Sequence, residues 1–572
     1  MAEELNKVPF SQIVLRKLIV SESFTPVDEN KVMCKYCLKF YSTKTSPTIL
    51  KRHLVNRHHD IINEDVLETK QKPSQEGFIS SLICWMIDDL QPFSVVERKS
   101  FQNLIESIPL NVTIPCRQSI AKLMDEEFEK ERTIQISQLS TLKSKISLTL
   151  DIWTSNSDDP YIGVIAHFVN SNWKLESKVL SVCKFEHPHT GEAIGGKLIS
   201  ISNQYSIANK IVSITTDSAA NMIRGYETFA NYLYETYQIR LIHYRCAAHI
   251  INLVVQKSKL KSNPTIERAR NVIKHILSSS KLIQDLRTTQ TDRAKPLELI
   301  LDCPTRWNST FDMLERMITL KSSLLKLSID HPDIQNLLPT IIEWDEIELL
   351  CEFLKPFNTA TKILSANKIC SIGYTLFVFK ALQISLDENK SRVQNSALML
   401  EVLNRYISRY SPDMLICAFL DPQNKGRYFE QIPESLMLNI NEVYNQYKLL
   451  FGNLTIQQEE KNCNELDDSL LTLIVNRKRK RTELQTSEIE RYLEIQSPRG
   501  EFDIMKWWEN NTQQFPVLST IAADYLSCQA TSVECERLFS IAGLASNKTR
   551  NRLDPQTVNI LLCLKNWKSQ NP

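Results

Sequence analysis

A strand with one apolar and one polar face is the first regular pattern in the middle of the chain. In the run KISLTLDIW, from Lys145 to Trp153, apolar residues occupy every second position between Ile146 and Ile152. A period of two is typical of a half-buried β-strand, and it places Asp151 on the less apolar face. Further strands are expected at 161–169, 176–185, 210–216 and 239–243, with helices at about 192–205, from about 219, and up to 255.

This order of three strands followed by alternating helices and strands is that of a ribonuclease-H-like fold. In that fold the first and fourth strands are parallel neighbours, so Asp151 and Asp217 would stand side by side. Adjacent carboxylates suit hard divalent cations, and paired metal ions can support phosphodiester cleavage. Taken alone, Asp217 precedes Ser218 and could simply cap the following helix.

Residues 256–455 carry a helical pattern. Trp344, Ile347, Leu350 and Leu354 recur at steps of three and four, which predicts an all-helical insertion in the core. Residues 63–140 also look helical and polar. Around 456–485 the composition becomes polar, and the run Arg477–Arg481 is basic. We interpret it as a linker with a nuclear-import signal or DNA-backbone contact, or as a solvated basic turn.

Composition excludes some classes of function. The 572 residues are 42% hydrophobic and 23% charged, with 11 glycines, as expected for helix-rich globular domains. The formal net charge of +2 gives no overall polyanion-binding character, so any nucleic-acid footprint must be local. No 18-residue apolar run and no secretory leader occur, and we expect a soluble intracellular protein with reduced thiols.

A metal-binding module is predicted near the N-terminus. Cys34 and Cys37 form a C-x-x-C pair, and His53 and His58 follow after a gap of fifteen residues. The spacing falls in the range for tetrahedral zinc, with the thiols on a short hairpin and the histidines on a helix. His59 leaves the choice of the last ligand open, and two unrelated cysteines beside a histidine-rich turn are the alternative.

The charge of this module favours DNA. Residues 26–60 contain seven Lys or Arg and three acids, a net charge of +4. Lys44, Lys51, Arg52 and Arg57 lie on or beside the predicted helix, where they could contact phosphates or the major groove. A solvated basic helix face is the alternative. The ending His53-Leu54-Val55-Asn56-Arg57-His58 resembles that of the BED zinc finger, a DNA-binding module often found on transposases.

Several further motifs resemble the hAT superfamily of transposases. They are Asp151-Ile152-Trp153-Thr154-Ser155, Thr216-Asp217-Ser218-Ala219-Ala220-Asn221-Met222, Cys246-Ala247-Ala248-His249, Arg306-Trp307-Asn308-Ser309-Thr310 and Ala530-Thr531-Ser532-Val533-Glu534-Cys535-Glu536-Arg537-Leu538-Phe539-Ser540. The resemblance covers nearly the whole chain. It implies that Asp151, Asp217 and Glu536 are the catalytic acids and that they would hold Mg²⁺ or Mn²⁺.

The resemblance also leaves open questions. Glu534-Cys535 stand where many relatives have Pro-Ser, so two acids compete for the role of third ligand. Trp307 would stack on a flipped base and Arg306 would contact a phosphate, although a tryptophan packed under a helix explains Trp307 equally well. For Cys246 and His249 a site-shaping role is favoured over zinc, because two ligands do not close a tetrahedral site.

Trp507-Trp508, Phe515-Pro516 and the stripe Val558, Leu561, Leu562 and Leu564 resemble the hAT C-terminal dimerisation region, which implies a second copy as partner. The expected fold class is a multidomain α+β protein. We expect a tail at 1–25, the zinc finger at 26–62, a linker and small helical domain at 63–140, the first part of the core at 141–255, the helical insertion at 256–455, a polar and basic linker at 456–485, and the core end with the dimerisation region at 486–572.

The resemblance implies a nuclear, zinc-containing, dimerising transposase that binds double-stranded DNA and cleaves and transfers its strands with Mg²⁺ or Mn²⁺. The alternative is a domesticated derivative that regulates transcription without cleavage.

Overall fold

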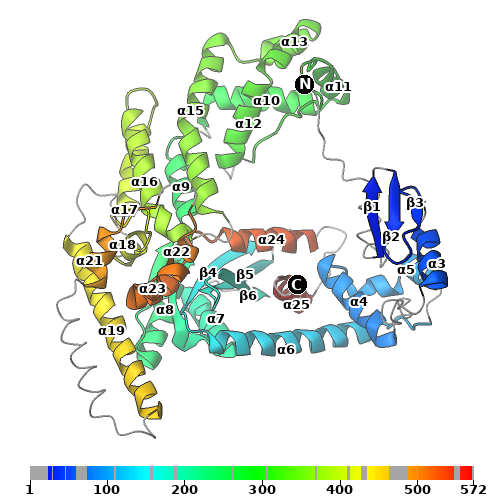
Figure 1. The fold of residues 1–572 in the computed structure, drawn as a ribbon. Coiled ribbons are helices and arrows are strands. Elements are labelled where there is room, and N and C mark those ends of the chain that lie inside the picture. The colour runs from blue at the N-terminus through cyan, green and yellow to red at the C-terminus, as the bar shows by residue number, and fades with distance from the viewer. Residues whose placement is uncertain are drawn as a thin grey trace. The chain divides into compact units, whose positions relative to one another are not determined.

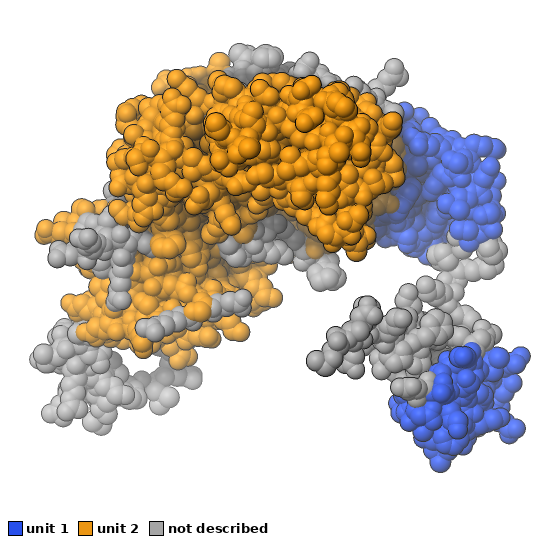
Figure 2. All heavy atoms as spheres, turned by 90° about the horizontal axis from the view of Figure 1, so that it is seen from above, with its two compact units in different colours: residues 1–86, 93–120 blue, residues 87–92, 121–572 orange. Residues whose placement is uncertain are grey.

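The computed structural model consists of two compact units (Figure 2). Unit 1 comprises residues 1–86 and 93–120, and unit 2 comprises residues 87–92 and 121–572. The structure describes residues 23–28, 30–45, 47–58, 74–108, 111–154, 159–185, 190–259, 262–303, 307–366, 370–408, 412–426, 434–462, 487–498, 500, 502–545 and 554–569. None of the helices described there combines the length and apolar character needed to cross a membrane.

Unit 1 begins with a three-stranded antiparallel sheet and a helix. The sheet has the order β1-β2-β3, with β1 (Phe24–Asp28), β2 (Lys31–Cys34) and β3 (Phe40–Ser42). Helix α3 (Pro47–Arg57) follows. The predicted hairpin and helix are therefore present, and β1 adds a third strand to the hairpin. Helices α4 (Gln75–Asp88), η2 (Phe93–Glu97), α5 (Lys99–Glu106) and α6 (Arg117–Thr141) come next, and most of α6 belongs to unit 2.

Unit 2 is built on a five-stranded sheet of order β6-β5-β4-β7-β8 (Figure 1). Its strands are β4 (Ile146–Thr154), β5 (Pro160–Val169), β6 (Leu175–Lys184), β7 (Ile211–Thr216) and β8 (Ile242–Arg245). Strand β4 pairs antiparallel with β5 and parallel with β7, with Leu148 opposite Ile214. The prediction that the first and fourth strands of this sheet are parallel neighbours is confirmed by the pairing of β4 with β7. The fifth strand, β8, lies later than the predicted 239–243.

The prediction of a half-buried β4 was wrong, because both faces of the strand are covered. The polar residues Ser147 and Thr149 are as buried as the apolar residues beside them. The Ser147 hydroxyl lies 2.9 Å from the Ser527 hydroxyl, and the Thr149 hydroxyl lies 2.9 Å from Nε2 of His167. Such partners satisfy buried polar groups, so a polar side chain in the sequence did not mark a solvent-facing position.

Helices surround this sheet at the predicted places. Helices α7 (Gly191–Gln204), α8 (Ala220–Tyr237) and α9 (Ala247–Gln256) follow β6, β7 and β8. Helix α25 (Pro555–Lys568) closes the β6 edge, where the side chain of Asn559 accepts from the Val182 amide and that of Asn566 from the Val179 amide. A covered edge strand cannot pair with another chain, so the last helix completes the core.

The remaining helices form the insertion and the end of the core (Figure 1). They are α10 (Pro264–Leu277), α11 (Ser280–Thr288), α12 (Trp307–Thr319), α13 (Lys321–Asp330), α14 (Pro332–Leu337), α15 (Ile341–Leu364), α16 (Ser371–Glu388), α17 (Ser396–Ile407), α18 (Pro412–Phe419), α19 (Glu434–Asn462), α21 (Glu488–Glu494), α22 (Ile504–Asn511), α23 (Pro516–Tyr525) and α24 (Val533–Ala545). One apolar cluster runs from α9 through α23. The insertion and the core end therefore share a single interior.

Candidate functional site

The zinc finger predicted from spacing assembles in unit 1. Ligand atoms of Cys34, Cys37, His53 and His58 all lie within 4.8 Å of one another. Sγ of Cys34 is 3.5 Å from Nε2 of His58, and Sγ of Cys37 is 3.3 Å from Nε2 of His53. Two thiols and two imidazoles at these separations fit one tetrahedral Zn²⁺ ion, so the donor set is that of a structural zinc site.

Local packing and electrostatics are consistent with this role. The apolar core of the finger is small and consists of Phe24, Val32, Cys34, Leu50 and Leu54, with Tyr41 packed against it. Burial raises the pKa of Cys34 and lowers the pKa of His53, so without metal both groups favour their neutral forms. Neutral imidazole is the form that binds zinc, whereas the thiol must lose its proton.

The basic residues predicted to contact DNA are placed as far as the structure describes them. Arg52 and Arg57 are exposed on α3, and Lys44 is exposed in the turn before it. Lys51 belongs to α3, but its side chain lies outside the described residues, as does His59. Three of the four predicted cations are thus available on the surface of the finger.

The three acids predicted in unit 2 line one cavity of about 710 Å³. Asp151 comes from β4, Asp217 directly follows β7, and Glu536 lies in the first turn of α24. Burial raises the pKa of Asp151 to about 8, and the negative charges of Glu536 and Asp217 add to that effect. The fold therefore gathers acids that are up to 385 positions apart in the chain.

The acids are neighbours around the cavity and not a closed ligand cage. Among the described residues, only the finger brings three or more His, Cys, Asp or Glu ligand atoms within 4.8 Å of one another. Asp151 accepts a hydrogen bond from the Ile152 amide, and Asp217 accepts one from the Ala219 amide just before α8. Helix α8 begins after Ala219 as N-cap, with no side-chain capping hydrogen bond, so the capping role considered as an alternative for Asp217 is not observed.

The position of Glu536 depends on how α24 packs on the sheet. Thr149, Asp151 and Trp153 share one face of β4, and the Trp153 ring stacks on Phe539 of α24 at 5.7 Å between centroids. Sγ of Cys535 lies 3.6 Å from the Thr149 hydroxyl. Because Cys535 and Phe539 point into the sheet, Glu536 is directed toward the cavity.

The competing acid Glu534 lies elsewhere. Its carboxylate is 3.8 Å from Nδ1 of His167, a buried residue of β5, and it is not among the residues that line the cavity. Burial lowers the pKa of His167, so this imidazole is neutral near pH 7. Of the two acids that the sequence left open, Glu536 is the one beside Asp151 and Asp217.

A glycine allows this close packing of α24. Gly163 of β5 is paired with Asp151, and a Cβ atom added to Gly163 would lie 2.8 Å from the Phe539 ring. Phe539 is buried and stacked on Trp153, so its ring has little room to retreat.

We therefore expect Gly163→Ala to destabilise unit 2 by about 1–3 kcal/mol through overpacking, as measured by denaturant unfolding. Gly196→Ala is the matched control, because nothing lies within 4 Å of its added Cβ. The cost of Gly163→Ala should shrink in a Phe539→Leu background. Equal costs in both backgrounds would contradict this account of the packing.

The helical insertion forms the other wall of the cavity. Trp307 and Asn308 at the start of α12 line it, as do Cys246 and His249 at the start of α9. Trp307 is largely buried and meets Phe357 edge to face at 6.4 Å between centroids, whereas Arg306 lies outside the described residues. Trp307 is thus both packed under the insertion and in contact with the cavity.

A buried network fixes the start of α12. Arg270 donates two hydrogen bonds of 2.8 Å to Asp302, and the Thr310 hydroxyl donates a third to the same carboxylate at 2.8 Å. The guanidinium holds the pKa of Asp302 below its usual value despite burial. A bidentate pair of this kind fixes the relative orientation of the two side chains and also contributes binding energy. The network therefore holds this wall in place.

Several lining residues were missed by the sequence analysis. They are Asn252, Asn308, Asp312, Lys362, Ser365 and Arg537. Lys362 and Ser365 come from the end of α15, and Arg537 follows Glu536 on α24. No spacing rule connects these positions, because they meet only through the packing of the insertion against the core. Their helical pattern signalled burial and gave no sign of a cavity.

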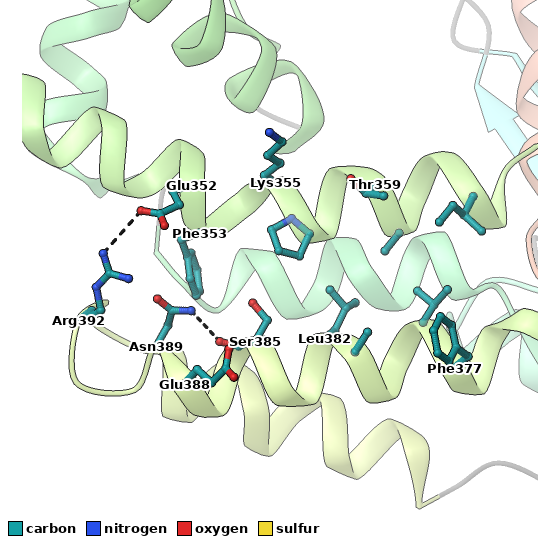
Figure 3. Close-up of a pocket in the computed structure, with 15 residues that line it drawn as sticks. Glu352, Phe353, Lys355, Thr359, Phe377, Leu382, Ser385, Glu388, Asn389 and Arg392 are labelled. Carbon is teal, nitrogen blue, oxygen red and sulfur yellow. Dashed lines mark hydrogen bonds and ion pairs between the residues drawn. The ribbon is translucent and has the colours of Figure 1, made fainter. Parts of the chain in front are cut away.

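A second cavity of about 630 Å³ lies between α15 and α16 (Figure 3). Its floor is apolar, with Phe353 and Leu382 among the lining residues, and the ion pair of Glu352 and Arg392 at 3.6 Å lies at one end. No acid of the first cavity takes part in it. The two cavities use different residues of α15.

Comparison with known proteins gives four family matches along the chain. Residues 23–59 match the BED zinc finger, residues 149–241 the ZBED1 RNase-like domain, and residues 244–353 the ZBED1 RNase-like helical domain. Residues 488–568 match the hAT family C-terminal dimerisation region. These matches follow the order of the finger, the sheet, the insertion and the end of the core.

Similar curated proteins include transposases and BED proteins. The chain is 25% identical to the putative AC transposase of Zea mays over 83% of this chain and 63% of that protein. It is 24% identical to the zinc finger BED domain-containing protein RICESLEEPER 2 of Oryza sativa subsp. japonica, over 100% of this chain and 90% of that protein. It is 26% identical to the putative transcriptional regulator tpeD of Talaromyces stipitatus, over 85% of this chain and 61% of that protein. The chain therefore spans just under two thirds of the length of the maize transposase.

Proposed function

We propose a function from one premise, namely that the chain is a hAT transposase-like protein with an N-terminal BED zinc finger. On this proposal it is a nuclear DNA-binding protein that self-associates through its C-terminal region and cleaves and transfers DNA strands. The finger binds double-stranded DNA through Lys44, Lys51, Arg52 and Arg57. Arg306 contacts a phosphate and Trp307 an extruded base.

The observation that carries the catalytic part is the shared cavity of Asp151, Asp217 and Glu536. Three carboxylates offer the oxygen ligands that Mg²⁺ and Mn²⁺ prefer. The raised pKa of Asp151 fits such a role, because a divalent cation would offset the cost of its buried negative charge. When bound, these ions would supply Lewis acidity and activation of the attacking hydroxyl or water.

Residues of the chain would prepare the substrate around this centre. Asp151 and Asp217 hold their carboxylates in place through backbone amides, and the packing of α24 keeps Glu536 beside them. The residues of α12 and α15 that line the cavity would orient the strand next to the acids. Orientation is a contribution that a rigid site makes to phosphoryl transfer.

A second function is favoured by two observations. The carboxylate oxygens of Asp151, Asp217 and Glu536 do not all lie within 4.8 Å of one another. In addition, one relative is named a putative transcriptional regulator. The corresponding function is that of a domesticated protein, which binds DNA through the finger and regulates transcription without cleavage.

One experiment separates these functions. DNA selected by the full-length chain from a random duplex pool is incubated with that chain and Mn²⁺, and strand nicks are resolved on a denaturing gel. We expect nicking by the wild type and by Glu534→Gln, and its loss in Asp217→Asn. Tight zinc-dependent binding without any nicking would contradict the transposase function and leave the regulator.

A further inference from the structure

The cavity that contains the acids is also lined by two cationic side chains. Among its described lining residues, Lys362 and Arg537 are the only lysine or arginine, against four acids: Asp151, Asp217, Asp312 and Glu536. A cavity with this excess of negative charge repels the phosphates of a DNA strand unless cationic side chains lie along the path of that strand. The placement of Lys362 and Arg537 therefore bears on how DNA would enter.

The two cations lie on the same part of the wall. Lys362 and Ser365 are three residues apart on α15, so their side chains share a helix face, and both line the cavity. Arg537 comes from α24, and its Nη2 donates to the Ser365 carbonyl at 2.6 Å. Because Ser365 is the C-cap of α15, the guanidinium is held at the negative end of that helix, beside Lys362.

Lys362 has no carboxylate partner of its own. None of the described Asp or Glu side chains lies within 4.0 Å of its ammonium group, and the residue is exposed while lining the cavity. In contrast, Lys321, at the far end of the insertion, pairs with Glu348 at 2.8 Å. A lysine left unpaired beside four acids is available to an anionic ligand.

We propose that Lys362 and Arg537 form a binding site for a DNA backbone phosphate next to the one at the three acids. This inference rests on the proposed function, because it assigns a substrate contact to the same cavity. Arginine suits phosphate through its planar set of N–H donors, and lysine contributes a point charge. Asp151 and Asp217 come from the sheet and Lys362 from α15, while α24 supplies both Glu536 and Arg537, whose guanidinium turns to the end of α15.

The test measures binding without cleavage. The full-length zinc-loaded chain is titrated against a fluorescent twelve-nucleotide single strand in Ca²⁺, and the affinity is followed as a function of salt concentration. The plot of log affinity against log salt has a negative slope, and each lost phosphate contact to a single strand makes this slope shallower by about 0.7. We expect that reduction for Lys362→Ala and about twice as much when Arg537→Gln is added.

Lys355→Ala is the matched control, because Lys355 lies on the same helix but lines the other cavity (Figure 3). Its salt slope should equal that of the wild type. Arg537→Lys retains the charge and should keep most of the slope, and thermal unfolding verifies that each variant is folded.

The proposal is overturned if Lys362→Ala keeps the wild-type slope, if Lys355→Ala loses as much, or if the wild type does not bind the strand. Failure of the proposed cleavage has a different signature. A chain that never nicks DNA in Mn²⁺ but shows the slope change in Lys362→Ala loses its transposase assignment and keeps this phosphate site.

Discussion

Removal of zinc is expected to unfold the finger and leave unit 2 intact. The apolar core of the finger has five buried side chains, Phe24, Val32, Cys34, Leu50 and Leu54. A core of this size is far below what an independent domain needs. Zinc contributes about 10–16 kcal/mol in isolated finger peptides near neutral pH, so the folded state depends on the metal.

Cys37→Ser should have the same effect as chelation, because it removes one of four ligands. The measurement is hydrogen exchange of the full-length chain followed by mass spectrometry. Peptides covering β1 to α3 should lose their protection, whereas peptides covering α7, α8 and α9 should keep theirs. Duplex binding should fall together with the protection of the finger.

Two substitutions serve as controls. Cys84→Ser removes an exposed thiol of α4 that belongs to no ligand group among the described residues, and it should change nothing. His59→Ala tests the ligand that the sequence left open, and protection should persist because His58 completes the group. A finger that stays protected in the presence of a strong chelator would exclude a structural role for zinc.

The parts of the site that sequence reasoning found are those with a fixed local geometry. Spacing gave the finger ligands, apart from the choice between His58 and His59, because a hairpin and a helix place C-x-x-C and its histidines at a set distance. Strand periodicity gave β4 and β7, and their parallel pairing then brought Asp151 and Asp217 to one end of the sheet. The first inference needed only local spacing, and the second also needed the strand order of a ribonuclease-H-like fold.

The parts that it missed depend on contacts between distant segments. Glu536 was one of 66 acidic residues and was found by resemblance. Its orientation follows from Gly163, Cys535 and Phe539, which no pattern in the chain connects. Lys362 and Arg537 line one cavity because the insertion packs on the core, and the polar residues of β4 are buried under the segment that contains Ser527 and Cys535. Tertiary packing decided each of these positions.

Asp151→Asn is expected to stabilise unit 2 at alkaline pH when no divalent cation is bound to the acids. Burial raises the pKa of Asp151 to about 8 in the folded chain, against an ordinary value of 3.8. Between these two values the folded state binds more protons than the unfolded state, so stability falls as the pH rises. Asparagine keeps the size of the side chain and removes the charge.

The size of the effect follows from the two pKa values. A difference of about four units corresponds to a penalty of about 5 kcal/mol at pH 8 and above, which shrinks to below about 2 kcal/mol at pH 5. Thermal unfolding of the wild type and of Asp151→Asn at both pH values measures it, with Gly196→Ala reporting the pH response of the rest of the chain. The melting temperatures of the wild type and Asp151→Asn should diverge as the pH rises. Parallel melting curves from pH 5 to pH 8 would mean that Asp151 is already ionised at low cost, and the buried carboxylate could then not be the group whose charge a bound cation offsets.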